Sequence, residues 1–600
     1  MKKSLLTLLA LMGLTAGDVL ANDSRVAVPD GGQLIIAVDT LTPAAVEGDK
    51  MALAEIQSIP ATELPTNVSV GLRVGTPAGF TADWDVVTRA PLRKAIRKGD
   101  VMLATFQARC HESMTGEAVI QFAFERNGEP YNKSAYMRFG VRETWTTFYV
   151  PFIVDDNYAP DEAHATFHMG FDGQVVDLAD LRVVNYRDTL TLTDLPRSEV
   201  NYAGRAADSP WRAEADARIE KNRKADASIT VRDADGQPIP GVTVRFTQTR
   251  HAFPFGTAIA VPGLLDPSAD GDRYREVLKD DFNAGVFENA MKWYNHDVAT
   301  LEETDRALAW LLDAGFEMRG HVLVWPGWEW LPKSLKALAD NPAALKAAAE
   351  QRVTETATHF RGKLVDWDVL NEPFTNHDLM DILGNEVMVD WFKLAEAADP
   401  DTNRYLNDWG ILTTGGRPSP HQQHFEDTIQ YLIDQGAPIT GIGMQGHFGG
   451  TLTAPRDIWK VLDRYSRFDL PIKITELDID LNDPALQADF MRDVLTAAFA
   501  HESVVGVTVW GFWAKRHWRA SAAHYDPDWN RRPVGEVWKQ LTQETWSTDE
   551  QSQTDVNGQA LFRGFKGDYN VVITFDDGTT HTKNVKLGDD GIDLSIDTTG

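Results

Sequence analysis

Apolar and polar residues alternate with a period of two over the first third of the chain. Glycine, proline, asparagine and aspartate separate these short runs, and no amphipathic helical pattern of useful length occurs among them. This pattern predicts a β-sandwich, a jelly roll, over residues 22–201. The runs expected as strands include Gln33–Val38, Val68–Val74, Val101–Gln107, Ala118–Phe124, Ala135–Phe139 and Thr146–Pro151.

The rhythm changes over residues 251–545, where short apolar runs alternate with helical stretches such as Thr304–Ala314, Pro342–Phe360 and Pro484–Ala500. Eight strands with crossover helices predict a (β/α)8 barrel, the TIM barrel. A doubly wound open sheet is the alternative, but the glycine-rich phosphate loops typical of that fold are absent from the sequence. The expected strands are Pro254–Ile259, Ala284–Glu288, Met318–Trp325, Val365–Glu372, Tyr405–Asp408, Gly441–His447, Ile472–Asp478 and Val504–Phe512.

Two β-rich pieces flank the expected barrel. Residues 202–225 are charged and rich in alanine and arginine, which predicts a linker helix, and residues 226–250 read as a hairpin. A hairpin is not stable alone, so we expect its missing strands in residues 546–600. The two pieces resemble halves of a small carboxypeptidase-regulatory-like sandwich that is split around the barrel. Two unrelated fragments are the alternative.

Composition narrows the class of partner. A chain of 600 residues is too long for one core, so several domains are expected. The formal net charge of -30 argues against nucleic acid and against an anionic membrane surface. It is compatible with a neutral polymer as partner.

The first residues have the pattern of an export signal. Lys2 and Lys3 precede an apolar run from Leu5 to Gly17, and a small residue, Ala21, marks the expected cleavage point. Residues 1–21 are therefore interpreted as a signal peptide, which predicts a secreted, periplasmic or cell-surface protein. No later stretch is apolar enough to span a membrane. Cys110 is the sole cysteine, which excludes an intramolecular disulfide and a cysteine-based zinc site.

Chemistry is expected where the barrel strands end. Glu372 and Glu476 each follow an apolar strand, and the carboxyl ends of parallel strands form the active rim of such barrels. Paired carboxylates are what glycoside hydrolysis needs, although each glutamate alone fits a strand cap or an arginine pair equally well. Other groups expected at the rim suit a sugar, because they combine amides, carboxylates and aromatic rings: Glu288, Asn289, Lys292, His321, Trp325, Asn371, Tyr405, Asn407, Asp408, Gln445, His447, Trp510 and Trp518.

The barrel region resembles glycoside hydrolase family 10, the endo-β-1,4-xylanases. The resemblance is carried by Glu288–Trp293, Gly320–Trp325, Trp367–Glu372, Gln445–His447, Ile474–Asp478 and Trp510–Phe512, in that order. It implies hydrolysis of xylan with retention, in which Glu372 is the general acid/base and Glu476 the nucleophile. It implies no cofactor and no metal. We also expect a monomer.

The resemblance also implies roles for the remaining rim residues. Asn371 resembles the donor to the sugar 2-hydroxyl, and His447 the residue that orients the nucleophile. Tyr405 is assigned to substrate binding by its strand position alone. Ligands of the sugar on the non-reducing side correspond to Glu288, Asn289 and Lys292, and walls around the cleaved bond to His321, Trp325, Gln445, Trp510 and Trp518.

Two positions depart from the family pattern. Pro326 stands where a second histidine is common, and Trp409 where a tyrosine is commoner. These departures put the leaving-group side of the cleft, and the preferred substrate decoration, in question.

The N-terminal sandwich loosely resembles carbohydrate-binding modules. Its candidate stacking residues are Trp84, Tyr131, Tyr136, Trp145 and Tyr149, although aromatic residues of a sandwich serve its core more often than a ligand.

Two other functions compete with a xylanase. One is another β-1,4-glycanase on the same barrel; a cleft closed by Trp510 and Trp518 at the position of a C6 hydroxymethyl group would exclude glucose. The other is a non-catalytic polysaccharide-binding protein, which the presence of Glu372, Glu476 and Asn371 disfavours.

Overall fold

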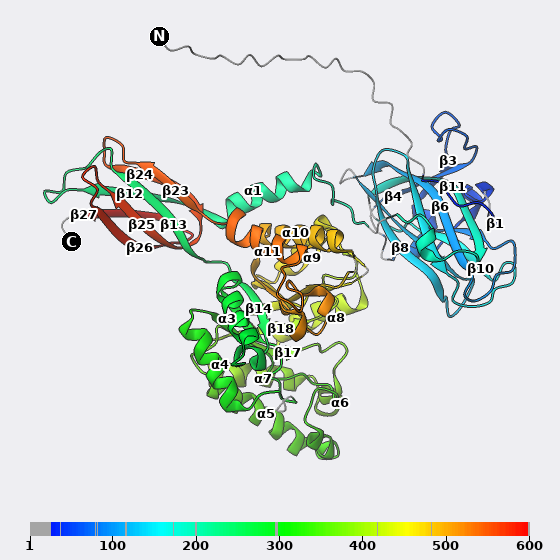
Figure 1. The fold of residues 1–600 in the computed structure, drawn as a ribbon. Coiled ribbons are helices and arrows are strands. Elements are labelled where there is room, and N and C mark those ends of the chain that lie inside the picture. Colours follow the sequence, from blue (N-terminus) through cyan, green and yellow to red (C-terminus); the bar gives the residue numbers. More distant parts are fainter. Residues whose placement is uncertain are drawn as a thin grey trace, which may run out of the picture.

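The computed structural model describes residues 26–597, except 37, 78–79, 81, 114–116, 172, 199–200, 295–297, 417, 450 and 482. The expected signal peptide lies outside the described residues. Three bodies are visible: a β-sandwich, a barrel with its helices, and a small β-domain (Figure 1). Among the described residues, no helix is both long and apolar enough to cross a membrane.

Two antiparallel sheets form the N-terminal body. The first has the order β3 (Glu55–Ser58), β4 (Gly71–Thr76), β11 (Gln174–Arg187), β6 (Val101–Ser113), β9 (Thr146–Ile153), with β1 (Gln33–Ile36) also on β11. The second, called sheet B below, has the order β2 (Val46–Glu47), β5 (Val87–Pro91), β10 (Ala163–His168), β7 (Ala118–Arg126), β8 (Lys133–Val141). The apolar faces of both sheets meet in a core built around Phe106, Phe122 and Phe167.

Eight parallel strands close into a barrel, as the sequence predicted, when β19 and β20 are counted as one strand. Neighbouring strands pair in chain order, and β19 also pairs with β21, which closes the ring. The third strand is shorter than expected and ends at Gly320, and the sixth is interrupted between Met444 and His447. The strands are β14 (Phe255–Ile259), β15 (Ala284–Phe287), β16 (Glu317–Gly320), β17 (Asp366–Asn371), β18 (Asn403–Asp408), β19 (Gly441–Met444) with β20 (His447–Phe448), β21 (Ile472–Ile479) and β22 (Val504–Val509).

Helices surround the barrel and begin at recognisable caps. Pro342 starts α5 and Pro484 starts α10, each behind a side chain, Asn341 or Asp483, that accepts a backbone N–H of the first turn. The helices are α2 (Val261–Leu264), α3 (Ala269–Asp281), α4 (Leu301–Asp313), α5 (Pro342–His359), α6 (Asp378–Leu383), α7 (Glu386–Ala398), α8 (Pro420–Asp434), α9 (Pro455–Ser466), α10 (Pro484–Ala500) and α11 (Pro533–Lys539).

The two β-rich pieces that flank the barrel pair with each other. In the first sheet, β12 (Lys224–Arg232) lies between β24 (Gln559–Phe565) and β27 (Ile592–Asp597). In the second sheet, β13 (Thr243–His251) lies between β23 (Asp549–Gln553) and β25 (Gly567–Thr574), with β26 (Thr580–Leu587) outside. Phe246 stacks between Phe562 and Tyr569 in the shared core. The barrel is therefore inserted between strands of one small β-domain.

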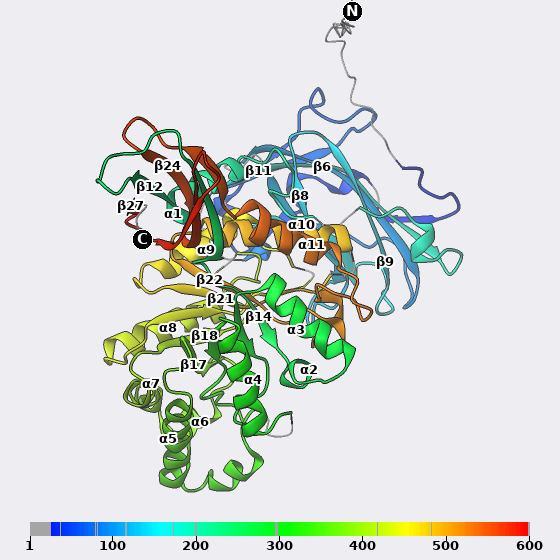
Figure 2. The same ribbon diagram turned by 60° about the vertical axis from the view of Figure 1, so that its left-hand side comes forward.

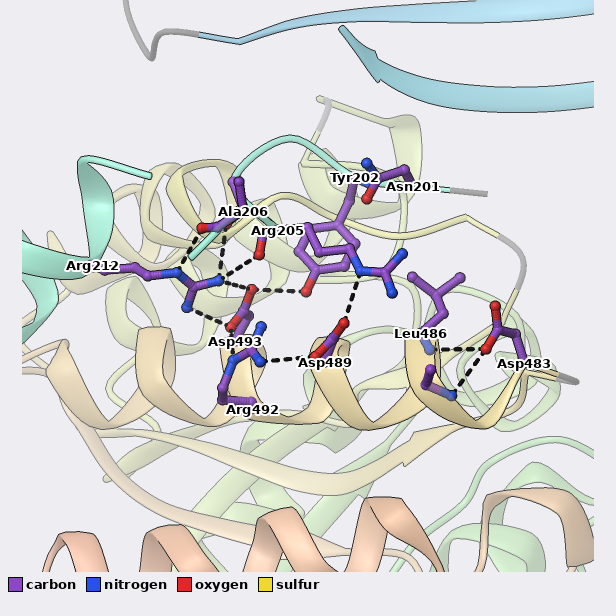
Figure 3. Close-up of polar contacts among 12 residues, drawn as sticks. Asn201, Tyr202, Arg205, Ala206, Arg212, Asp483, Leu486, Asp489, Arg492 and Asp493 are labelled. Atoms are coloured by element: carbon purple, nitrogen blue, oxygen red, sulfur yellow. Dashed lines mark hydrogen bonds and ion pairs between the residues drawn. The ribbon is translucent and has the colours of Figure 1, made fainter. Parts of the chain in front are cut away.

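The segment between the sandwich and the small domain packs on α10. The helix expected over 202–225 is observed as α1 (Trp211–Arg223), after an irregular stretch. The buried carboxylate of Asp493 accepts hydrogen bonds at 2.8 Å from Tyr202 Oη, from both terminal nitrogens of Arg212, and from Arg492 Nε (Figure 3). Arg205 Nε donates to Asp489 at 2.9 Å. In the view of Figure 2, α10 and α11 lie between the strands of the sandwich and the strands of the barrel.

Candidate active site

Glu372 lies one residue beyond β17, where the strand opens into a loop. Its backbone φ of 54° is in the left-handed region, which costs a non-glycine residue about 1–3 kcal/mol and is found most often at functional sites. Its backbone N–H donates to the Asn407 carbonyl at 2.9 Å. Its side chain accepts from Gln445 Nε2 at 2.7 Å and from Asn376 Nδ2 at 3.1 Å. Strand pairing and two amides therefore fix the direction of this carboxyl group.

Glu476 comes from β21, three strands away from β17. The carboxylate is 4% exposed and accepts a hydrogen bond from Asn407 Nδ2 at 2.9 Å. His447 Nε2 lies 3.2 Å from its other oxygen. Both oxygens of this carboxylate are therefore positioned by side chains from neighbouring strands.

A network of three amides joins the two glutamates. Gln445 Nε2 contacts Glu372 and also lies 3.4 Å from Asn371 Oδ1, while Asn407 Nδ2 donates to Asn371 Oδ1 at 2.9 Å and to Glu476. Asn371 Nδ2 is buried and has no hydrogen-bond partner among the described residues. A buried donor without a partner is costly unless a ligand satisfies it. Asn371 therefore offers an unpartnered amide group beside the network that joins the two glutamates.

The environment separates the pKa values of the two glutamates. Burial raises the pKa of Glu372 to about 7, and the charges of Asp408 and Glu476 add to this shift, while the hydrogen bond from Gln445 opposes it. For Glu476, burial acts in the same direction, but the hydrogen bond from His447 and the charges of His447 and His321 lower its pKa overall. One carboxyl group is thus suited to donate a proton at neutral pH, and the other to stay ionised.

His447 is held as a cation between two acids. Its Nδ1 lies 3.0 Å from Asp478 Oδ2, opposite the contact with Glu476. Burial lowers the pKa of His447, but the hydrogen bonds to Asp478 and Glu476 outweigh burial and raise it to about 9. Trp518 packs edge-on against this ring at 4.8 Å and donates from Nε1 to Asp478 at 2.7 Å. The sequence did not single out Asp478 as a functional residue, although it lies two residues beyond Glu476 on the same strand face.

Another part of the rim forms a small aromatic slot. Lys292 Nζ donates to Asn289 at 3.1 Å and lies 5.2 Å from the centre of the Trp325 ring, which stacks on Trp330 at 4.0 Å. Burial raises the pKa of Glu288 and lowers that of Lys292, and their opposite charges oppose both shifts. A cavity of about 100 Å³ is lined by Asn289, Lys292, Trp325 and Trp330 together with Trp293, Tyr294 and Val322.

Beneath the glutamates, the barrel interior is filled with paired charges. His321 Nδ1 lies 2.9 Å from Asp368, which also accepts from Arg319 at 2.6 Å, and the His321 ring meets the edge of Trp510 at 5.2 Å. Lys473 donates to Asp366 in the same layer. These buried pairs hold the strands that carry the site in register.

Tyr405, which the sequence analysis assigned to substrate binding, does not reach the rim. It is 1% exposed and lies in this charged layer, with Arg319 and Lys473 about the face of its ring at 5.5 and 5.6 Å. Side chains two residues apart on a strand point to the same side but lie at different depths in the barrel. Asn407, two residues further along β18, is the one that contacts Glu476.

Two more residues join the site from the loops. Asn376 contacts Glu372, as described above, and Trp409 Nε1 lies 3.3 Å from Thr375 Oγ1, beside Asn376. Trp409 is 41% exposed. A loop residue carries no periodic signal, so the sequence indicated Trp409 only as a departure from the family pattern and did not indicate Asn376.

One group of potential metal ligands lies outside the barrel. Glu63, His111 and Asp177 approach one another in the sandwich. Both acids are already engaged, because Arg73 and Arg109 donate to Glu63 and to Asp177. Two arginines at the same place do not suit a cation, so this group is an ion-pair network.

An eight-stranded parallel barrel with two glutamates at strand ends defines the class of glycoside hydrolases built on TIM barrels. Residues 246–539 match the family model described as Glycosyl hydrolase family 10. The barrel of this chain belongs to that family, which confirms the resemblance seen in the sequence.

Curated relatives match more than half of this chain at moderate identity. The chain is 33% identical over 370 residues to "Anti-sigma-I factor RsgI6" of Acetivibrio thermocellus, covering 61% of this chain and 47% of the relative. It is 27% identical over 389 residues to "Endo-1,4-beta-xylanase 1" of Arabidopsis thaliana, covering 64% and 40%. The chain thus spans about half or less of these curated relatives. The solved structure of xylanase 10B from Thermotoga petrophila RKU-1 in complex with xylobiose has 23% identity and a TM-score of 0.45, covering 49% of this chain and 95% of that chain.

Proposed function

We propose that this protein is a secreted endo-β-1,4-xylanase that hydrolyses xylan with retention of configuration. The observation that carries the proposal is the pair of glutamates with opposite pKa shifts on one network of amides. In the retaining mechanism two carboxyl groups stand about 5–5.5 Å apart on either side of the scissile bond. The amide network is consistent with such proximity.

The mechanism follows from the two environments. Glu476, ionised and oriented by Asn407 and His447, attacks the anomeric carbon, while protonated Glu372 gives its proton to the leaving oxygen. The attack consumes the negative charge of Glu476, which lowers the pKa of Glu372. Glu372 then takes a proton from the water that hydrolyses the glycosyl–enzyme bond. The unpaired N–H of Asn371 is available for the 2-hydroxyl of the sugar throughout.

The substrate class and the location of the protein are proposed on separate grounds. Xylan is proposed from the family and from the relatives named as xylanases, and export from the sequence pattern of residues 1–21. A glucan-cleaving enzyme is the alternative within the class. One relative is named an anti-sigma factor rather than a hydrolase, so the barrel family by itself does not establish activity.

The test compares Glu476→Gln and Glu372→Gln with the wild-type protein on xylan and on carboxymethyl cellulose. We expect release of reducing sugar from xylan only, and a loss of about 10³-fold or more in each variant. Near wild-type activity of either variant on xylan contradicts the assigned roles. Equal rates on both polymers contradict the proposed substrate class.

A further inference from the structure

The outer face of sheet B carries an organised layer of polar side chains. Residues directly opposite each other on antiparallel strands share a face, which here places His164 beside Glu125, His168 beside Gln121, and Gln121 beside Arg138. These side chains are 2–7% exposed, apart from Arg138 with 11% of its side chain exposed. Most of this polar layer is therefore shielded from solvent.

Hydrogen bonds and ion pairs fix this layer. Glu125 lies 2.7 Å from Lys133 Nζ and 3.3 Å from His164 Nε2, and Arg138 Nε donates to Gln121 at 3.2 Å. Asp83, from the short turn η4 (Asp83–Asp85), accepts from Tyr136 Oη at 3.0 Å. Glu125 and Asp83 pair with Lys133 and Arg138, respectively, and His168 lies 3.7 and 3.8 Å from the same two acids. Such a surface does not favour an ionic ligand of either sign.

Aromatic side chains border the same layer. Tyr136 lies on the outer face of β8, opposite Ala123, and is 44% exposed. Trp84 follows Asp83 in the chain and is 61% exposed. Thr166, in the middle of the face, is 1% exposed, and its hydroxyl has no partner among the described residues. Exposed aromatic rings lie beside hydrogen-bonding groups whose charges are paired. This combination suits a neutral sugar chain.

Two other aromatic candidates of the sandwich, Trp145 and Tyr149, pack against residues outside this layer. Trp145 donates to the Glu63 carbonyl at 3.1 Å and stacks on Arg109, and Tyr149 is 7% exposed within a small apolar cluster. Tyr131 lies in the turn between β7 and β8 and is 45% exposed.

Sheet B contacts a barrel loop that leads to the active-site rim. Arg138 packs so closely on Gly415 that a β-carbon there would lie 1.9 Å from its guanidinium. Gly415 belongs to the loop that starts at Trp409, and Trp409 contacts Thr375, next to the Asn376 that binds Glu372. The contacts thus run from the general acid to Trp409, along the loop to Arg138, and on to Tyr136 two residues away on β8.

We propose that the outer face of sheet B, bordered by Trp84 and Tyr136, binds a neutral β-1,4-linked polysaccharide and extends the cleft on the side of Glu372. The choice of xylan as this polysaccharide rests on the proposed function. Since Glu372 protonates the leaving group, the sheet would hold the part of the chain that leaves first. Polymeric substrates benefit from this surface, whereas short substrates end before they reach it.

The first experiment measures binding in the full chain with hydrolysis removed. In a Glu476→Gln background, we compare the parent, Trp84→Ala/Tyr136→Ala and the control Ile153→Ala by affinity electrophoresis in gels with soluble xylan. Ile153 is 48% exposed on β9 of the other sheet. We expect about a tenfold weaker apparent affinity in the double variant and no change in the control. Equal retardation of all three proteins overturns the proposal, as does an equal loss in the control.

A second readout uses the active protein and also separates this proposal from the proposed function. The ratio of kcat/KM on polymeric xylan to kcat/KM on an aryl xylobioside should fall about tenfold in Trp84→Ala/Tyr136→Ala. An unchanged ratio overturns the proposal. If the wild-type protein shows no xylanase activity but Trp84→Ala/Tyr136→Ala still reduces retardation, the proposed function fails while the binding surface stands.

Discussion

At the scale of single residues, the protonation states of Glu372 and Glu476 set the behaviour of the site. The burial that raises the pKa of Glu372 also acts on Glu476, where His447 and the charge of His321 reverse its effect. The site therefore depends on where positive charge is placed as much as on the carboxyl groups themselves.

The first prediction concerns pH. Activity requires Glu372 protonated, so kcat/KM should fall as pH rises through about 7. It requires Glu476 ionised, so activity should also fall on the acidic side, below the usual range of a glutamate because its pKa is lowered. A pH profile of kcat/KM on xylo-oligosaccharides measures both limbs. In Glu372→Gln the basic limb should vanish; its persistence near pH 7 would assign that limb to another group.

The second prediction concerns His447, which acts through Glu476. His447→Asn removes the cation, so the pKa of Glu476 rises and the acidic limb moves to higher pH. We expect a loss in kcat of roughly 10–100-fold, comparable to the loss of one strong charge-assisted contact. The matched control is His359→Asn. His359 ends α5, its side chain is 35% exposed and pairs with Asp305 of α4, and its replacement should leave the profile unchanged. A loss of activity without any movement of the acidic limb would indicate a merely structural role.

Sequence reasoning located the residues whose position depends on strand ends. Asn371 and Glu372 meet Gln445 in the structure because β17 and β19 end at one rim. Tyr405 was wrong by two residues along β18, since alternation fixes which side chains point inward but not how deep each lies. Asn376 was missed because loop conformation depends on tertiary contacts that no local pattern encodes.

At the scale of elements, the small β-domain is built from strands separated by the whole barrel. The pairing of Val242–Phe246 with the end of the chain could be anticipated, because a lone hairpin with an apolar face needs further strands. The shortened third strand and the interrupted sixth strand were not anticipated. The apolar run of the third strand continues after Gly320, and Val324 forms an isolated bridge with Leu370. The sixth strand breaks at Gly446, whose φ is 88°.

The third prediction tests this shared core. Phe246→Ala removes a ring that stacks between Phe562 and Tyr569, which should destabilise the small domain by about 3–5 kcal/mol. Hydrogen exchange should show faster opening of β24 and β25, although both lie some 300 residues away in the sequence. Leu561→Ala, at a 66% exposed position of β24, is the control and should have little effect. Unchanged protection of β24 and β25 in Phe246→Ala would contradict a common core.

At the scale of the whole molecule, one buried carboxylate ties the linker to the barrel. Asp493 lies on α10 and binds Tyr202 and Arg212 of the linker, which follows β11 in the chain (Figure 3). The same linker also contacts sheet B, because a β-carbon at Gly140 of β8 would lie 3.1 Å from Ala203. The linker therefore joins the sandwich to the barrel.

The fourth prediction is that Asp493→Asn loosens this attachment while the catalytic groups stay in place. The change leaves two partly exposed guanidinium groups, of Arg212 and Arg492, facing a neutral amide; because solvent screens them, we expect a cost of about 1–2 kcal/mol. Proteolysis within residues 203–210 should become faster, and activity on polymeric xylan should fall more than activity on an aryl xylobioside. Asp489→Asn, at a 31% exposed partner of Arg205, should give a smaller effect of the same kind. Equal losses on both substrates would place the damage in the barrel itself, because α10 also packs against β21, the strand that carries Glu476.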